Sequence, residues 1–333
     1  MLNIGVIGYG YWGPNVVRNF HAVDQCCVKR VCDVNSNSLN RTRKSFPSVE
    51  LTSNCDDILT AADIDAVAVV TPVATHFPLA KKAMENGKHV FVEKPFAQTA
   101  AQAQELIELA TKKNLKIMVD HTFLFTAAVR KIKELIDSNV LGTIYYYDSI
   151  RVNLGLFQSD VNVIWDLAPH DLAIMQHLIA HKPQALVATG QNHVNGKEDV
   201  AYITLYFPER IIAHFNVNWL SPVKVRTALI GGEKKMIVWN DLEADEKIRV
   251  YNKGVERTNG GGLHDLLVSY RMGDIWAPRL EQTEALKAEA QYFVDCIRND
   301  ETPFNDGVAG LQVVRMLEAA DASLAKRGGM IYL

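Results

Sequence analysis

The sequence has few cysteines and none of the spacings that bind zinc or form a redox motif. Its five cysteines are an odd number, no C-x-x-C pair occurs, and three of them fall between residues 26 and 32. Such a pattern is typical of small buried thiols in a reducing compartment. We therefore expect a cytoplasmic protein with no metal centre.

Long hydrophobic runs and blocks of positive charge are also missing. No apolar run approaches the roughly 18 residues that cross a bilayer, and the first residues show neither the basic stretch nor the cleavage site of a secretory signal. The net charge is −3, so no electrostatic feature favours nucleic acid. We expect a small-molecule substrate and neither a membrane nor a nucleic-acid partner.

The first 120 residues instead alternate between apolar strands and helical patterns. Continuous apolar segments such as Ala66–Val70 are typical of a parallel sheet that is covered on both faces. With 333 residues, the chain is long enough for two domains. The sequence predicts an α/β protein whose N-terminal domain, residues 1–122, is a doubly wound dinucleotide-binding (Rossmann) fold.

After about residue 125 the pattern changes to period-two alternation, which is typical of an antiparallel sheet with one face on a core. A helix is expected at about Leu167–Ala180, and two more close the chain. Residues 253–280 are expected to be irregular. The expected strands are Thr143–Asn153, Ala185–Gly190, Val200–Phe207, Arg210–Leu220, Val225–Ile230, Met236–Trp239 and Lys247–Tyr251. Residues 123–333 are thus predicted to form an α+β domain whose other sheet face is covered by helices or a second subunit.

A glycine-rich turn follows the first strand at once and leads into a helix. It reads Gly8-Tyr9-Gly10-Tyr11-Trp12-Gly13, the G-x-G-x-x-G pattern of dinucleotide sites. Gly8 allows the tight turn, Gly10 lets the pyrophosphate approach the backbone, and Gly13 lets the helix pack on the strand. The helix N-terminus offers N–H groups to the phosphates.

An acid stands where the cofactor ribose is expected. Asp33 ends the second apolar run, 20 residues after Gly13. A carboxylate at this place binds ribose hydroxyls and repels a 2′-phosphate, so the sequence favours NAD over NADP. Arg41 and Arg43 lie close enough in the sequence to weaken that preference. The alternative is an ordinary surface aspartate at a strand end.

Two clusters follow the next strands, at the edge where α/β sheets bind ligands. Thr71-Pro72 with Thr75-His76 is expected near the cofactor, and otherwise serves as a strand end with a helix cap. Glu93-Lys94-Pro95 places a lysine where the nicotinamide is expected, so Lys94 can stabilise a developing alkoxide. The alternative is an exposed lysine before a proline, and the sequence leaves open whether that peptide bond is cis.

A third cluster contains an acid and a histidine. Asp166 and His170 are four residues apart and share one face of a helix. A histidine there can take a hydroxyl proton near neutral pH, with the carboxylate orienting its ring. Asp166 could equally be the cap of the helix, with Pro169 in its first turn. A metal site would need a further ligand.

These motifs together resemble the glucose–fructose oxidoreductase/inositol dehydrogenase (Gfo/Idh/MocA) family over essentially the whole chain. The resemblance implies a Rossmann domain, a C-terminal domain with a large, mostly antiparallel sheet, and NAD(P) chemistry on sugars or polyols. It implies that Lys94, Asp166 and His170 are catalytic, and that homodimers or homotetramers form through the open sheet. The implied cofactor residues are Gly8, Gly10, Tyr11, Trp12, Gly13, Asp33, Thr71, Pro72, Thr75, His76, Glu93 and Lys94.

Within the family, three short motifs resemble those of members that oxidise UDP-N-acetylglucosamine, or its uronic acid, at C3. They are Gly10–Asn15, Arg151–Gly155 and Trp165–Asp171. Free inositols, polyols or aldoses are the alternative substrates, and an NAD- and sugar-sensing regulator without turnover is the alternative of another class. Arg271 and Arg279 are candidates for a diphosphate. The full set of expected substrate contacts is Lys94, Arg151, Asn153, Asn162, Trp165, His170, Tyr270 and Arg271.

Overall fold

The computed structural model describes residues 1–155, 157–158, 161–259 and 266–333. They form two compact units: unit 1 holds residues 1–126 and 283–318, and unit 2 holds residues 127–282 and 319–333. The division differs from domains 1–122 and 123–333 mainly because residues 283–318 fold with the N-terminal part. Within the described ranges, no helix is both long and apolar enough to cross a membrane.

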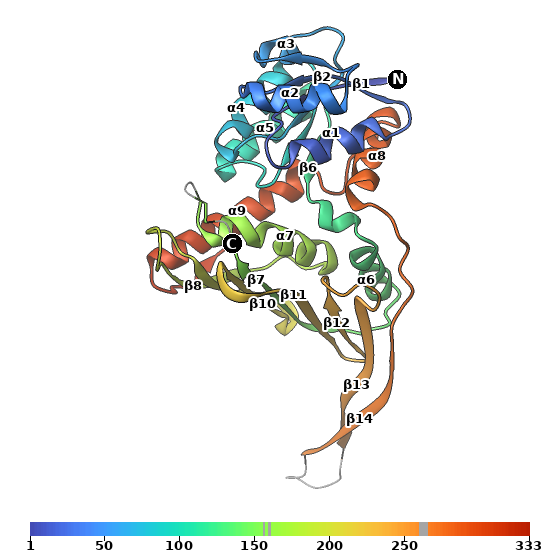
Figure 1. Ribbon diagram of the computed structural model, residues 1–333. Coiled ribbons are helices and arrows are strands. Elements are labelled where there is room, and N and C mark those ends of the chain that lie inside the picture. Colours follow the sequence, from blue (N-terminus) through green and yellow to red (C-terminus); the bar gives the residue numbers. More distant parts are fainter. Residues whose placement is uncertain (156, 159–160, 260–265) are drawn as a thin grey trace. The chain divides into compact units, whose positions relative to one another are not determined.

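Unit 1 is built on a six-stranded parallel sheet in the order β3-β2-β1-β4-β5-β6 (Figure 1). The strands are β1 (Leu2–Ile7), β2 (Cys26–Cys32), β3 (Glu50–Thr52), β4 (Ala66–Val69), β5 (His89–Glu93) and β6 (Ile117–Asp120). The helices between them are α1 (Gly13–His21), α2 (Ser36–Ser45), α3 (Asp56–Leu59), α4 (His76–Glu85) and α5 (Ala100–Lys113). This is the order of a doubly wound nucleotide-binding sheet, and its switch point lies between β1 and β4.

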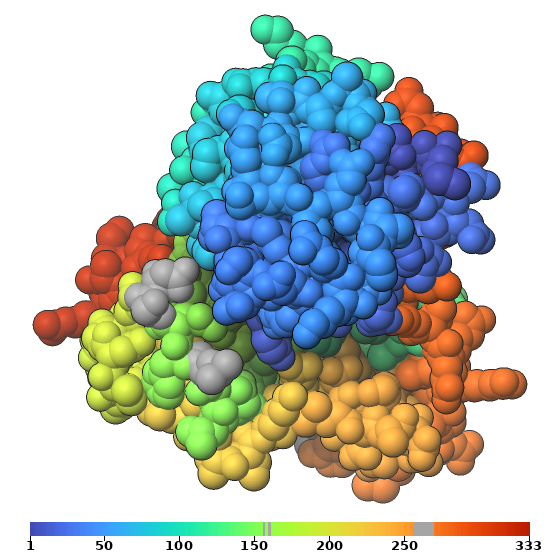
Figure 2. Space-filling view, turned by 45° about the horizontal axis from the view of Figure 1, so that its top comes forward, coloured from blue at the N-terminus to red at the C-terminus, as the bar shows by residue number. Residues whose placement is uncertain are grey.

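A helix from the far end of the sequence completes the core of unit 1. α8 (Ala285–Arg298) places Phe293 against Phe20 of α1 and Phe91 of β5. The three rings have centroid separations of 5.3 to 6.1 Å in edge-to-face arrangements, which are favourable for aromatic pairs. All three are fully buried. Residues 283–318 therefore fold with the Rossmann sheet. The N-terminal part of the same unit, coloured blue to cyan, forms one continuous surface in Figure 2.

Unit 2 contains a nine-stranded sheet in the order β14-β13-β12-β11-β7-β10-β9-β8-β15. Only β7 and β10 pair in parallel; the other neighbours are antiparallel, as the alternating sequence predicts. The strands are β7 (Ile144–Leu154), β8 (Ala185–Gln191), β9 (Val200–Tyr206), β10 (Ile212–Asn218), β11 (Leu220–Gly232), β12 (Met236–Asn240), β13 (Ile248–Asn259), β14 (Leu266–Trp276) and β15 (Ile331–Tyr332). The fold class is thus confirmed in both units.

Helices cover one face of this sheet. α6 (Ala127–Asp137) and α7 (Val163–Leu178) belong to unit 2, and Figure 1 shows α7 lying over the strands. α9 (Gly307–Ala325) contributes to unit 1 up to Glu318 and to unit 2 from Ala319. The face of β7 that carries Tyr147, Ser149 and Arg151 is buried.

A buried ion pair joins α7 to that strand. Arg151 donates from Nε and Nη2 to the two carboxylate oxygens of Asp171, at 2.6 and 2.9 Å. Both side chains are 5% exposed, so the guanidinium lies inside the unit and not on a solvated strand face. A two-pronged pair of this kind fixes the rotation of α7 relative to the sheet. Arg151 therefore has a structural role at this position.

The stretch of residues 253–280 is more regular than its sequence suggests. β13 continues to Asn259 and pairs antiparallel with β14, and the two form a ribbon that extends beyond the other strands of the sheet (Figure 1). Its exposed side chains include Tyr270 and Met272, at 77% and 82%. The expectation of an irregular segment is therefore wrong. The polar, glycine-containing sequence does not indicate strands, and hydrogen bonding between β13 and β14 stabilises them.

We predict that Asp171→Asn lowers the free energy of unfolding by about 3 kcal/mol, because it leaves a buried guanidinium without a carboxylate. Asp137→Asn is the matched control: it removes the acid of the exposed Lys133–Asp137 pair and should cost less than about 0.5 kcal/mol. Urea unfolding followed by circular dichroism measures both. Equal, small losses in the two variants would contradict a structural role for the Arg151–Asp171 pair.

Candidate active site

The glycine turn between β1 and α1 is shaped by two close approaches and one opening. Gly8 has φ of +101°, and a Cβ there would lie 2.1 Å from the carbonyl oxygen of Val70. A Cβ on Gly13 would lie 2.5 Å from the carbonyl oxygen of Gly8. Nothing lies within 4 Å of a Cβ built on Gly10. The middle glycine therefore faces open space, as the approach of a pyrophosphate requires.

Asp33 lies directly at this turn. Its Oδ2 accepts a hydrogen bond from the backbone N–H of Tyr9 at 2.6 Å, and its Oδ1 accepts one from that of Asn35 at 2.7 Å. Each oxygen keeps a lone pair that could receive a ribose hydroxyl. The residues present thus fit a dinucleotide: a glycine turn open at its centre, and an oriented carboxylate beside it.

A cation shares this neighbourhood. Nη2 of Arg41 donates to the carbonyl oxygen of Tyr9 and to Oγ of Ser38, both at 3.2 Å. Tyr9 thus has Asp33 on its N–H and Arg41 on its carbonyl. The sequence suggests that Arg41 is near the ribose region; the structure shows how it is held there. Arg43 lies two residues further along α2 and is exposed.

His76 links two of the predicted cofactor clusters. Its ring nitrogens lie 2.7 Å from the carbonyl oxygen of Thr71 and 2.8 Å from that of Pro95. The ring is buried, and this burial lowers the pKa of His76, against the opposite effect of the two carbonyl contacts. Thr75 adds a hydrogen bond from its hydroxyl to that of Thr71 at 2.7 Å. The carboxyl ends of β4 and β5 are therefore tied together, and the Lys94–Pro95 bond there is cis.

Three buried carboxyl groups lie beneath Lys94. Glu93 precedes it and accepts its backbone N–H at 3.1 Å, and Asp120 is the neighbour of Glu93 across β5 and β6. Glu289, from α8, accepts from the backbone N–H of His121 at 3.1 Å. Burial, reinforced by the charge of Asp120, raises the pKa of both Glu93 and Glu289 well above the usual range. The protonated form of both groups is therefore favoured.

The carboxyl cluster also reaches the glycine turn. The indole Nε1 of Trp12 donates to Oδ2 of Asp120 at 3.2 Å. Trp12 is therefore anchored from below, whereas Tyr11 is 93% exposed. Burial also lowers the pKa of His121 to about 4, so no cation from this histidine offsets the cluster. Sequence reasoning named Glu93 and Trp12 but not Asp120, His121 or Glu289, because the cluster joins residues that are far apart in the chain.

The histidine and acid of the third cluster lie on α7. This helix begins after Asn162, whose side chain accepts from the backbone N–H of Trp165 at 3.1 Å. Asn162 is thus the cap, and the alternative in which Asp166 caps the helix is wrong. Oδ2 of Asp166 instead accepts from Nε1 of the buried Trp219 at 3.0 Å. Asp166 and His170 follow one another at one helical turn, as their spacing predicts.

The remaining candidate substrate residues are distributed over unit 2. Asn162 and Trp165 both donate to Asp321 of α9, at 2.9 and 2.7 Å. Asn153 is half-buried near the end of β7. Tyr270 is exposed on β14, and the neighbouring Arg271 is bonded to the carbonyl oxygen of Lys234 between β11 and β12. These contacts give Asn162, Trp165 and Arg271 structural partners within the unit.

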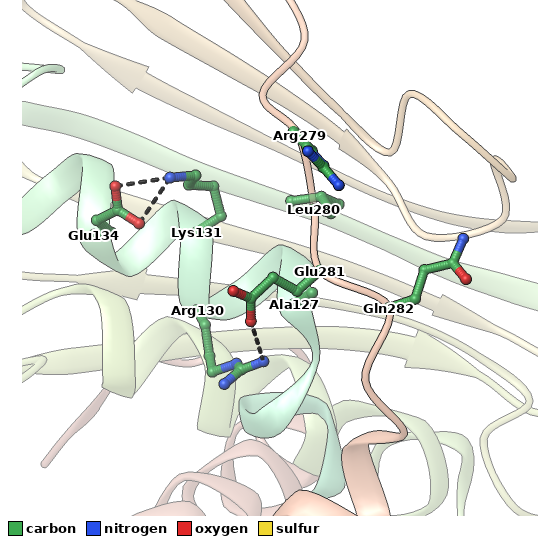
Figure 3. Close-up of a pocket in the computed structure, with 8 residues that line it drawn as sticks. All are labelled: Ala127, Arg130, Lys131, Glu134, Arg279, Leu280, Glu281 and Gln282. Atoms are coloured by element: carbon green, nitrogen blue, oxygen red, sulfur yellow. Dashed lines mark hydrogen bonds and ion pairs between the residues drawn. The ribbon is translucent and has the colours of Figure 1, made fainter.

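Arg279 lines a cavity of about 790 Å³ within unit 2 (Figure 3). Arg130 and Lys131 of α6 line the same cavity, with Glu281 3.9 Å from Arg130 and Glu134 2.7 Å from Lys131. The lining residues are Ala127, Arg130, Lys131, Glu134, Arg279, Leu280, Glu281 and Gln282. Sequence reasoning named Arg279 and missed the two cations of α6, which become neighbours only when the helix packs beside residues 279–282.

Among the residues that the structure describes, no group of three or more histidine, cysteine or acidic side chains is arranged to hold a metal ion. The six-stranded order, the glycine turn and the oriented Asp33 define a dinucleotide-binding protein.

Comparison with known proteins gives the family. Residues 2–121 match the model described as an oxidoreductase family with an NAD-binding Rossmann fold, and residues 129–238 match the GFO/IDH/MocA C-terminal domain. The chain belongs to the Gfo/Idh/MocA family of NAD-binding oxidoreductases, which confirms the resemblance seen in the motifs.

Similar relatives align along almost the whole chain. The UDP-N-acetylglucosamine 3-dehydrogenase of Acidithiobacillus ferrooxidans is 27% identical over 328 residues, or 94% of each chain. Its solved structure has a TM-score of 0.82 at 24% identity, covering 98% of both chains. A scyllo-inositol dehydrogenase of Lactobacillus casei, solved with NAD(H) and scyllo-inositol, has a TM-score of 0.81 at 20% identity, covering 100% of this chain and 99% of that one.

We predict that Glu289→Gln stabilises the protein increasingly as the pH rises. The raised folded-state pKa of Glu289 means that the folded protein holds a proton that the unfolded chain releases, so wild-type stability falls with rising pH. Glutamine can still accept the hydrogen bond from the backbone N–H of His121, and it carries no titrating proton. Its advantage should grow by about 1.4 kcal/mol per pH unit between the unfolded and folded pKa values of the carboxyl.

Calorimetry of Glu289→Gln at a series of pH values from about 5 to about 8 measures this gain. Glu85→Gln, at an exposed position of α4, is the matched control and should follow the wild-type pH dependence. A Glu289→Gln curve parallel to that of the wild type would show that Glu289 is ionised in the folded protein.

Proposed function

We propose that this oxidoreductase is an NAD-dependent dehydrogenase of a sugar ring carbinol, and that its substrate is a UDP-N-acetyl amino sugar, or its uronic acid, oxidised at C3. The observation that carries the proposal is the placement of three residues that we infer to be catalytic: a lysine at the end of β5, and an acid and a histidine one turn apart on α7. The 94% coverage shared with a UDP-N-acetylglucosamine 3-dehydrogenase supports the substrate.

In this proposal the residues of the chain act on the substrate hydroxyl. His170 takes its proton, the ammonium of Lys94 stabilises the negative charge that develops on the oxygen, and Asp166 positions His170. The bond from Trp219 holds the carboxylate of Asp166 in place. Bound NAD supplies the hydride acceptor at its nicotinamide ring.

Two features of unit 2 support the substrate and the assembly that we propose. The cavity beside Arg279 is lined by three cationic side chains, of which Arg130 and Lys131 are paired with carboxylates, and Arg279 is the side chain that we propose for a diphosphate. On the sheet face opposite Arg151, Tyr202, Tyr206 and Ile212 keep 39% to 42% of their surface exposed. We propose that this face mediates association into a homodimer or homotetramer, because apolar surface of this kind is typical of interfaces.

The direct test is turnover by purified protein with NAD and a panel of UDP-N-acetylhexosamines, their uronic acids, free inositols and free aldoses. NADH absorbance and keto-sugar product are both followed, with 2-oxoglutarate included as a reoxidant. Turnover of a UDP-sugar alone supports the proposal. Turnover of free polyols or aldoses would favour the alternative substrate, and NAD binding without any product would favour a regulator.

We predict that Lys94→Ala and His170→Ala each lower kcat at least about 100-fold, since each removes charge stabilisation or proton transfer from the reaction. NADH affinity should stay within about threefold of wild type in His170→Ala, because His170 acts on the substrate hydroxyl. The controls are Lys112→Ala and His181→Ala, at exposed positions. Sugar-dependent turnover that survives Lys94→Ala unchanged would contradict the assigned chemistry.

We also propose that NAD is preferred to NADP, with Asp33 and Arg41 acting in opposite directions. Wild-type protein should bind NADH at least about tenfold more tightly than NADPH, because a 2′-phosphate would meet the carboxylate of Asp33. Arg41→Ala should increase the ratio of the NADPH dissociation constant to the NADH dissociation constant, and Asp33→Ala should decrease it. Fluorescence titration measures the affinities, with Arg43→Ala as the control. An unchanged ratio in Asp33→Ala would exclude Asp33 as the selective group.

A further inference from the structure

Two cysteines that are 23 residues apart in the sequence meet at the end of the NAD-binding sheet. Sγ of Cys32 lies 3.5 Å from Sγ of Cys55. Cys32 is the last residue of β2 and is fully buried, whereas Cys55 is half-buried in the segment between β3 and α3. Both are free thiols in the structure. They lie at the carboxyl edge of neighbouring parallel strands, the edge where a dinucleotide binds.

The backbone of Cys32 is part of the cofactor turn. Its carbonyl oxygen accepts the N–H of Gly8 at 2.8 Å. The next residue is Asp33, whose carboxylate holds the N–H of Tyr9. A displacement of Cys32 therefore acts on the glycine turn and on the carboxylate assigned to the ribose. Of the two segments, the one that carries Cys55 has the fewer packing constraints, because Ser53 and Asn54 are exposed.

We propose that Cys32 and Cys55 form an oxidisable pair, and that the disulfide between them weakens NAD binding by displacing Asp33 and the glycine turn. The effect on NAD rests on the cofactor role proposed for Asp33; the oxidation does not. The sulfurs need to approach by about 1.5 Å to reach the disulfide length of about 2.05 Å.

The chemistry uses a peroxide as the oxidant. The thiolate of Cys55 attacks hydrogen peroxide, forming an S–O bond, breaking the O–O bond and releasing hydroxide, which is protonated to water. The sulfur of Cys32 then attacks that of Cys55, losing its own proton as the S–S bond forms and water leaves. Two thiols are oxidised by two electrons, and one peroxide is reduced to two waters. A dithiol reductant reverses the change.

The order of these steps follows from the environment of each thiol. A hydrogen bond from the thiol of Cys32 lowers the pKa of Cys55 to about 7, so a substantial fraction is thiolate near neutral pH. The same hydrogen bond, together with burial, raises the pKa of Cys32. Cys55 is also the more accessible of the two, so it is the residue that meets the peroxide.

The first test maps the oxidation. Reduced full-length protein is treated with a slight excess of hydrogen peroxide, alkylated and digested, and cross-linked peptides are identified by mass spectrometry. We expect a Cys32–Cys55 cross-link that a dithiol removes. Cys32→Ser should instead leave a sulfenic acid on Cys55 that dimedone traps, and Cys55→Ser should give neither product. Cys27→Ser, in the same strand, is the matched control and should cross-link as wild type does.

The second test measures NADH affinity of the reduced and oxidised protein by fluorescence titration. We expect at least about tenfold weaker binding after oxidation, restored by the dithiol and absent in Cys55→Ser. In a thiol–disulfide redox buffer, saturating NAD should shift the equilibrium of the pair toward the two thiols, because the coupling free energy between two sites is reciprocal. If peroxide treatment yields no Cys32–Cys55 cross-link, the proposal that the two cysteines form an oxidisable pair is wrong. If NADH affinity is equal with and without the cross-link, the proposed effect of the disulfide on NAD binding is wrong. Failure of the reduced protein to bind NADH would instead refute the proposed cofactor function.

Discussion

The structure of unit 1 depends on the close packing of Gly8 between its neighbouring strands. Its N–H is bonded to Cys32 of β2, and a Cβ in its place would collide with the carbonyl oxygen of Val70 beyond β4. A backbone locked on both sides gives the turn one conformation. That conformation brings Tyr9 to the carboxylate of Asp33. The geometry of this edge of the sheet is therefore a consequence of strand packing.

The two units handle buried charge in different ways. In unit 2, Arg151 and Asp171 are both charged, and their pairing in good geometry compensates for the loss of water. In unit 1, three carboxyl groups share one buried place beside Lys94, and burial together with the charge of Asp120 raises the pKa of Glu93 and Glu289. Lys94 adjoins the second arrangement and His170 adjoins Asp171. Each proposed catalytic side chain thus extends from an element whose position a buried polar contact determines.

Much of unit 1 could be predicted from the sequence, because its signals are local. The turn of Gly8–Gly13, the acid at the end of β2 and the lysine at the end of β5 follow from strand ends and spacing. What escaped prediction depends on contacts between distant segments. The periodicity of α8 shows an apolar face, yet only packing shows that Phe293 joins Phe20 and Phe91.

The cap of α7 and the β13–β14 ribbon show two other limits. Asp166 and Asn162 are both good capping residues, and tertiary contacts decide which of them caps the helix. Trp219 donates a hydrogen bond to Asp166, and Asn162 donates one to Asp321. The ribbon is stabilised by cross-strand pairing between segments with weak period-two patterns. In both cases the local sequence allowed more than one outcome, and contacts at long range selected one.

The separation between chemistry and specificity follows from where the residues lie. The residues that we propose as catalytic, Lys94, Asp166 and His170, lie at the end of β5 and on the packed helix α7. Tyr270 and Arg279 lie on an exposed ribbon and on the segment that follows it, where substitution costs little stability. Similar proteins of this fold include a UDP-N-acetylglucosamine 3-dehydrogenase and a scyllo-inositol dehydrogenase, so the fold accommodates different substrates. Our proposal therefore assigns the choice of substrate to the cavity of Arg279 and to the ribbon.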